Sequence, residues 1–202
     1  MSEGYIKFQC DWIKKSSVIS ESDLSILNNC RDRLYAENLV GAYADGIGFG
    51  NLSVRVENTQ EFIITGTQTG KYSKLTSQQY TRVCDYDISS NQLTCLGPIK
   101  ASSESLSHAA IYQAYESIKA VIHVHNLAFW KTYLDKLPTT SQKAEFGTPA
   151  MAQDILHLFK STKVLKTKCL IMGGHPEGII SWGENLAEAS EVLFKYYERL
   201  KK

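Results

Sequence analysis

The sequence has little of what marks a disulfide-rich, membrane-bound or nucleic-acid-binding protein. Its five cysteines are scattered and never form a C-x-x-C pair, which predicts neither a disulfide framework nor a thiolate zinc site. No stretch approaches the roughly 20 apolar residues of a membrane span, and the first residues hold no run of signal-peptide length. The formal charge is only +1, whereas a broad nucleic-acid surface or a polybasic membrane anchor needs a basic excess. We therefore expect a soluble cytoplasmic protein with free thiols and neither nucleic-acid nor membrane partners.

The chain also lacks internal repeats and any Pro/Gly/Ser-rich linker. Its 202 residues therefore predict a single domain spanning 1–202. The spacing of apolar residues and the turn signals predict short strands interspersed with helices along the chain. The pattern predicts helices at 22–39, 103–115, 127–137, 148–159 and 186–200, and strands at 52–56, 62–65, 85–88, 92–95, 120–125, 168–172 and 179–182. Strands in hairpins mixed with helices indicate an α/β fold with a mixed, largely antiparallel sheet covered by helices.

The run Val121-Ile122-His123-Val124-His125 is the sharpest chemical feature. Side chains alternate between the faces of a strand, so both histidines point the same way while Ile122 and Val124 face a core. Two imidazoles at this spacing can converge on one metal ion. The alternative is a pair of half-exposed histidines on a sheet.

His175 follows a separate apolar strand and comes after Gly173 and Gly174, which allow close backbone approach. A third neutral ring nitrogen would complete a site with an open coordination position, as in catalytic zinc centres. Taken alone, His175 would be interpreted as an ordinary loop histidine.

Glu104 lies at the expected start of a helix, where Ser102 or Ser103 is a candidate cap. In a purely structural interpretation, Glu104 occupies the first turn because the helix dipole favours a carboxylate there. In a functional interpretation, it exchanges protons with a substrate held at the metal.

Two loops rich in glycine are candidate anion cradles, Gly48–Asn51 and Thr65–Gly70. Exposed backbone N–H groups and hydroxyls bind phosphate or carboxylate without lysine. Neither loop matches the P-loop or the dinucleotide fingerprint, and both are compatible with simple tight turns.

Taken in order, the motifs resemble the class II aldolase/adducin family. They are Gly48-Phe49-Gly50-Asn51-Leu52-Ser53, Ile63-Ile64-Thr65 with its Gly/Thr loop, Tyr72-Ser73-Lys74-Leu75-Thr76, Ser102-Ser103-Glu104, Ala120-Val121-Ile122-His123-Val124-His125 and Gly174-His175. Each motif is weak alone, but their order and spacing along most of the chain are specific.

The resemblance implies a three-layer α/β/α sandwich and a cyclic homotetramer. It also implies a divalent metal, commonly zinc, held by His123, His125 and His175, with Glu104 as the acid/base. Asn51, Thr67, Gly70, Ser102 and Ser103 match the family's substrate-phosphate cradle. The implied activity is that of a metal-dependent lyase, an aldolase that cleaves a hydroxy-carbonyl sugar or sugar phosphate through a metal-stabilised enediolate.

The family contains alternatives, and this sequence departs from its pattern in two places. A dehydratase would use the same residues to eliminate water, an epimerase usually carries Asp where Glu104 stands, and an adducin-like module would not be catalytic.

Pro176 and Glu177 follow His175, where the family usually has glycine. We therefore expect Glu177 to project into the site. The Gly/Thr loop is also one residue longer than usual, which leaves Thr67, Thr69 and Gly70 as alternatives for the anion contact.

Overall fold

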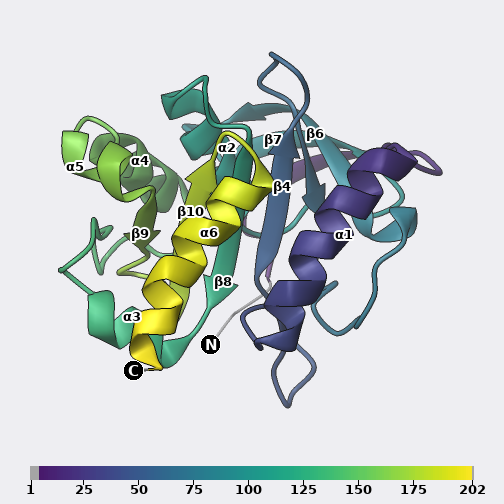
Figure 1. Cartoon of the computed structure of the whole chain (residues 1–202). Helices are drawn as coiled ribbons and strands as arrows, with labels where there is room; N and C mark the ends of the chain where they lie inside the picture. The colour runs from purple at the N-terminus through teal and green to yellow at the C-terminus, as the bar shows by residue number, and fades with distance from the viewer. Residues whose placement is uncertain (1–4, 202) are drawn as a thin grey trace.

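The computed structural model describes residues 5–201 as one large sheet with helices on both faces and a separate short hairpin (Figure 1). The strands are β1 (Gln9–Lys14), β2 (Gly41–Ala42), β3 (Gly48–Phe49), β4 (Asn51–Arg55), β5 (Phe62–Thr65), β6 (Tyr80–Asp87), β7 (Gln92–Gly97), β8 (Ala120–His125), β9 (Cys169–Ile171) and β10 (Gly178–Gly183). The helices are α1 (Glu21–Ala36), α2 (Ser105–Ala114), α3 (Leu127–Tyr133), α4 (Pro149–Leu158), α5 (Thr162–Thr167) and α6 (Leu186–Tyr197), with short 3₁₀ turns at Ser77–Gln79 and Glu198–Leu200.

The large sheet has eight strands in the order β1-β7-β6-β5-β4-β8-β10-β9. Within it β1 and β7 run parallel, while the other adjacent pairs are antiparallel. Strands β2 and β3 pair with each other in the separate hairpin. The expected mixed, largely antiparallel sheet is therefore confirmed.

Apolar side chains form one core on each face of the sheet. Helices α1, α3 and α6 cover one face, and residues such as Leu27, Phe129 and Leu193 pack there. Figure 1 shows α1 and α6 lying side by side across this face, with α2 behind the sheet. Helices α2, α4 and α5 pack on the other face through residues such as Met151 and Val164. This is the expected three-layer α/β/α arrangement.

Side-chain caps fix where several helices begin. Ser20, Thr148 and Asn185 each accept a hydrogen bond from the backbone N–H three residues later, at the starts of α1, α4 and α6. Pro149 occupies the first turn of α4, as the sequence predicts.

Several segments differ from the sequence prediction: β6 begins at Tyr80 rather than at 85, and α3 ends at Tyr133 rather than at 137. Residues 46–51 are not wholly loop, because Gly48–Phe49 forms β3 and Asn51 opens β4. Gly50 makes the bend between these strands with φ +75°, a left-handed conformation that suits glycine. Helix α5 was not predicted. It is a single capped segment after Ser161, too short to show a clear apolar period.

The structure can be compared with the sequence expectations about membrane spans and cysteines. Between residues 5 and 201, no helix combines the length and the apolar character needed to cross a membrane. The cysteines Cys10, Cys30, Cys84, Cys95 and Cys169 are free thiols, as expected.

Candidate metal and anion site

The first two histidines of the site come from β8, near the middle of the large sheet. This strand pairs with β4 on one side and β10 on the other and is buried along its length. Ile122 and Val124 point into the core beneath α1 and α6, so His123 and His125 share the opposite face. Their ring centroids lie 4.9 Å apart. The geometry expected from the H-x-H spacing is therefore present.

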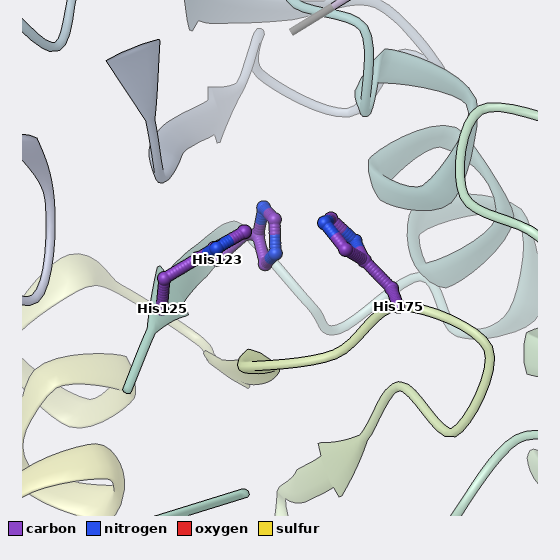
Figure 2. Close-up of side chains that lie close together, drawn as sticks. All are labelled: His123, His125 and His175. Atoms are coloured by element: carbon purple, nitrogen blue, oxygen red, sulfur yellow. The ribbon is translucent and has the colours of Figure 1, made fainter. Parts of the chain in front are cut away.

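His175 reaches the same place from the turn between β9 and β10. Its ring centroid lies 5.2 Å from that of His123 and 4.7 Å from that of His125, and Figure 2 shows the three rings gathered together. The turn passes close to another segment: a Cβ on Gly174 would lie 2.0 Å from the carbonyl oxygen of Ala144. The glycine before His175 is therefore needed for this approach, as the sequence indicated. The ring of Phe146 stacks on His175 at 4.5 Å and restricts its orientation.

The three histidines could hold a divalent metal ion. One ring nitrogen from each lies within 4.8 Å of the others, and all three residues are buried. Burial lowers the pKa of His123 and of His125 well below the usual value, and neighbouring imidazoles lower both further. Neutral imidazoles are the form that binds metal, and His123 Nε2 has no hydrogen-bond partner among the described residues. A set of three nitrogen donors fits zinc or a similar ion.

Glu104 lies beside this cluster. Its Oε1 is 3.9 Å from Nδ1 of His175, and its Oε2 accepts a hydrogen bond of 2.7 Å from the hydroxyl of Ser107. The side chain is 1% exposed. A carboxylate held so close to a candidate metal centre can exchange a proton with a molecule bound there.

The local structure around Glu104 corrects one prediction. Glu104 is itself the N-cap position of α2 rather than a residue of its first turn, and its side chain makes no capping bond. Ser102 acts earlier in the chain: its carbonyl oxygen accepts hydrogen bonds from the backbone and the hydroxyl of Ser105. His108, on the first turns of α2, is bonded elsewhere: its Nδ1 lies 2.7 Å from the hydroxyl of Ser53.

The candidate anion residues come together in a second, polar part of the site. Three segments, 48–51, 66–70 and 102–103, line one small cavity. The cavity contains every residue that the family resemblance assigned to a phosphate cradle, namely Asn51, Thr67, Gly70, Ser102 and Ser103. Asn51 also joins the two parts, because its amide nitrogen lies 3.3 Å from Nδ1 of His123.

The structure distinguishes the alternatives in the Gly/Thr loop. The hydroxyl of Thr69 donates a hydrogen bond to the carbonyl oxygen of Gly66, so it is engaged within the loop. Gly70 packs against the β2–β3 hairpin, and a Cβ there would lie 1.8 Å from the carbonyl oxygen of Gly41. Only glycine fits at this position, which fixes the shape of the loop. Thr67 is the remaining candidate for a side-chain contact with an anion.

Arg31 supports this loop and was missed by sequence reasoning. It is 2% exposed, and its guanidinium donates hydrogen bonds to the carbonyl oxygens of four loop residues, Thr69, Gly70, Tyr72 and Ser73. Among residues 5–201, no carboxylate forms an ion pair with it. Burial lowers the pKa of the guanidinium. A signal was available, because Arg31 falls at helical spacing between the buried Leu27 and Leu34.

Glu177 and Tyr43 adjoin His125 at the edge of the histidine cluster. The hydroxyl of Tyr43 lies 2.8 Å from Nδ1 of His125 and donates a hydrogen bond of 2.7 Å to Oε2 of Glu177. The departure from the family pattern after His175 thus brings a carboxylate to the edge of the histidine cluster, and its projection into the site stays a prediction. Sequence reasoning did not identify Tyr43.

A helix-covered mixed sheet with three buried histidines and an adjacent carboxylate defines a candidate metalloprotein. The family model for the Class II Aldolase and Adducin N-terminal domain matches residues 32–201. The chain therefore belongs to the class II aldolase/adducin family.

Individual relatives differ in the reactions for which they are named. The chain is 25% identical over 165 residues to a 3-oxo-tetronate 4-phosphate decarboxylase of Haemophilus influenzae, covering 71% of each chain. It is 30% identical over 106 residues to a probable L-ribulose-5-phosphate 4-epimerase of Mycoplasma pneumoniae, covering 52% of this chain and 42% of the relative.

Solved structures confirm the fold. An L-fuculose 1-phosphate aldolase superposes with a TM-score of 0.68 at 20% identity, covering 92% of this chain and 86% of that one. The L-fuculose-1-phosphate aldolase of Thermus thermophilus gives 0.63 at 20% identity, with coverages of 90% and 92%. At these identities the similarity shows a shared fold, and the reaction has to be inferred from the residues of the site.

Proposed function

We propose that the protein is a metal-dependent lyase, an aldolase that cleaves a hydroxy-carbonyl sugar or sugar phosphate. One observation carries the proposal: three buried imidazoles meet beside the Glu104 carboxylate, next to a polar cavity. In this proposal His123, His125 and His175 hold a zinc ion. Three protein ligands leave a coordination position for substrate.

The polar cavity would bind the phosphate end of the substrate. Backbone N–H groups of the glycine-rich loops and the hydroxyls of Thr67, Ser102 and Ser103 are suitable donors to an anion. The names of the two relatives and the two aldolase structures all include a sugar or acid phosphate, which supports this assignment. Asn51 contacts His123 and also lines the cavity, so it would help fix the distance between the phosphate and the reacting carbons.

Glu104 would move the proton. A bound metal supplies electrophilic polarisation of the substrate carbonyl. When the carbon–carbon bond breaks, the hydroxyl of the departing carbon releases its proton to solvent and that carbon leaves as an aldehyde, while the bonding electron pair stays on the carbon next to the substrate carbonyl. Protonated Glu104 then gives its proton to the electron-rich carbon, and in the synthetic direction its carboxylate removes the same proton. Ser107, which donates to Oε2, would hold the carboxyl group in place during this exchange.

The relatives favour decarboxylation and epimerisation as second candidates. Loss of CO₂ from a 3-oxo acid leaves an electron pair next to a carbonyl, so Glu104 would serve there in the same way. Epimerisation by cleavage and rejoining of a carbon–carbon bond would need the aldehyde to turn within the site. The epimerase resemblance covers about half of this chain, and the family's epimerases usually carry Asp at the position of Glu104.

The proposal extends to assembly and location. The family resemblance implies a homotetramer, and the free thiols of the five cysteines suit the reducing cytoplasm. Light scattering on the purified protein would measure the assembly directly. A monomer would remove the tetramer from the proposal without affecting the metal site.

A substrate panel tests the reaction. The metal-loaded protein would be incubated with hydroxy-carbonyl sugars and 3-oxo acids, each with and without a terminal phosphate, and assayed for aldehyde release, CO₂ release, epimer formation and loss of water. We expect aldehyde release from a phosphorylated substrate and its abolition by a chelator. Dominant loss of water would identify a dehydratase instead. Protein that binds no metal and ignores the chelator would favour a non-catalytic adducin-like module.

A further inference from the structure

Tyr43 forms a bridge between His125 and Glu177. Its hydroxyl is 2.8 Å from Nδ1 of His125 and 2.7 Å from Oε2 of Glu177. The direct separation between Nδ1 of His125 and that carboxylate oxygen is 3.9 Å, too long for a hydrogen bond. The carboxylate therefore acts on His125 through the tyrosine.

The proton count along this bridge determines the tautomer of His125. The hydroxyl of Tyr43 carries a single proton, and it donates that proton to Oε2 of Glu177. The tyrosine oxygen then accepts, and Nδ1 of His125 must be the donor. With the ring proton on Nδ1, a neutral imidazole presents the lone pair of Nε2 to a metal.

The surrounding chain holds both partners of His125 in place. Tyr43 sits in the β2–β3 hairpin, where its backbone N–H donates to the carbonyl oxygen of Ile47, and its ring contacts that of Phe49 at 4.6 Å. Glu177 accepts a backbone hydrogen bond from Asn126, next to His125. The two residues thus come from separate segments of the chain and meet beside Nδ1 of His125.

Glu177 has a backbone conformation that favours glycine. Its φ is +72°, in the left-handed region, where a residue with a side chain is disfavoured by about 1–2 kcal/mol. A glycine would relieve this strain but would remove the carboxylate. A carboxylate kept at such a position, with its oxygen on the bridge, indicates a role for the side chain itself.

We propose that Tyr43 and Glu177 are positioning residues that fix His125 as its Nδ1–H tautomer and direct Nε2 toward the metal. The inference rests on the proposed metal site and adds two residues to it. Hydrogen-bond partners of metal-binding histidines typically change metal affinity about 10–100-fold when they are removed. Loss of either partner should therefore weaken metal binding while the fold is retained.

Two variants test the bridge. In Tyr43→Phe the acceptor for Nδ1–H is lost, so both ring tautomers of His125 should become populated. In Glu177→Gly the tyrosine proton is released to donate to Nδ1, so the ring should shift toward the Nε2–H tautomer. Nitrogen-15 NMR of the metal-free protein reads the tautomer, and competition with a chromophoric chelator reads the zinc affinity. We expect about 10–100-fold weaker zinc binding in both variants.

The controls separate positioning from a structural role. Tyr115→Phe and Glu184→Gln remove the same groups from exposed residues and should leave the tautomer and the zinc affinity unchanged. Glu177→Gly relieves the left-handed strain, so a merely structural role predicts unchanged or higher stability without loss of affinity. An unchanged His125 tautomer and affinity in both test variants would overturn the inference. Wild-type protein that binds no zinc would instead refute the metal site, while the metal-free NMR measurement would still decide whether the bridge sets the tautomer.

Discussion

The two parts of the site are built in different ways. The histidine cluster consists of side chains, two from a central strand and one from a tight turn, and all are buried. The anion cavity consists largely of loop backbone, shaped by glycines and by hydrogen bonds from Arg31 to loop carbonyl oxygens. The first part depends on which side chain is present. The second depends on where the backbone runs, so an added Cβ at Gly70 would disturb it although no hydroxyl is lost.

This difference predicts two separable kinds of variant. Changes to the histidines should remove metal and leave anion binding, and changes beneath the loops should do the reverse. Asn51 is the exception, because it contacts His123 and lines the cavity. A variant of Asn51 should therefore affect both measurements.

The largest effect is expected for His123→Ala. Wild-type protein should hold about one zinc ion per chain, and the variant should hold none because two imidazoles remain in a site built for three. Elemental analysis after dialysis measures the content. His157→Ala, on an exposed face of α4, is the matched control and should retain the metal. Full metal content in His123→Ala would place the ion elsewhere.

Glu104→Gln should separate chemistry from metal binding. The amide keeps the shape of the side chain but cannot take up a proton, so we expect retained zinc and a turnover rate lower by about 10²–10⁴-fold. Proton exchange at the carbon next to the carbonyl, followed in deuterium oxide, measures the step directly. Ser107→Ala, which removes the hydrogen bond to Oε2, should give a smaller loss. Undiminished exchange in Glu104→Gln would assign the proton to another group.

The sequence predicts the fold and the histidine side of the site better than the loop side. The predicted strands 62–65 and 120–125 match β5 and β8 to the residue. The pattern of apolar residues and the turn residues on either side define the ends of a buried strand from the local sequence alone. The face shared by His123 and His125 follows from the same period of two. His175 was placed by family resemblance, since no local pattern says where a turn will lie relative to another strand.

Contacts between distant segments explain what the sequence did not reveal. Tyr43 and Glu177 are 134 positions apart, and their hydrogen bond exists only after the hairpin and the β9–β10 turn have packed together. Arg31 donates hydrogen bonds to carbonyl oxygens about 40 positions away. Every residue has a backbone carbonyl, so no sequence pattern indicates which ones the guanidinium will contact. The sequence placed Glu104 in the first turn of α2, whereas the structure has it at the N-cap, less than one turn away. Several neighbouring serines could each cap the helix, so the sequence did not define where it begins.

Arg31→Lys tests the anion part of the site. A lysine ammonium is a compact donor group and cannot reach four carbonyl oxygens with the geometry of a guanidinium, so the loop at 69–73 should loosen. We expect binding of inorganic phosphate, measured by titration calorimetry, to weaken by about tenfold, which corresponds to about 1.4 kcal/mol. Zinc content should not change. Arg33→Lys, an exposed neighbour on α1, is the control. Equal loss of zinc and phosphate in Arg31→Lys would mean that the two parts are not independent.

The smallest effect at neutral pH is expected for His108, a buried histidine that is bonded within the protein rather than facing a ligand. Its Nδ1 contacts the hydroxyl of Ser53, which also contacts Tyr112, and burial lowers its pKa to about 3. The unfolded chain takes up this proton below about pH 6.5, whereas the folded chain does not until about pH 3. Stability should therefore fall as the pH falls through this window, by at most about 1.4 kcal/mol per pH unit.

Urea unfolding of metal-free wild-type protein and of His108→Gln, between about pH 7 and pH 5, isolates this contribution. The other buried histidines are present in both proteins, so the difference between the two slopes of unfolding free energy against pH belongs to His108. The slope should be shallower in the variant whatever its absolute stability. Because His108 is bonded to Ser53 and is not one of the three clustered histidines, the slope difference should persist when zinc is added. Equal slopes would show that His108 becomes protonated as readily in the folded chain as in the unfolded one, and that its burial is relieved by water reaching the ring.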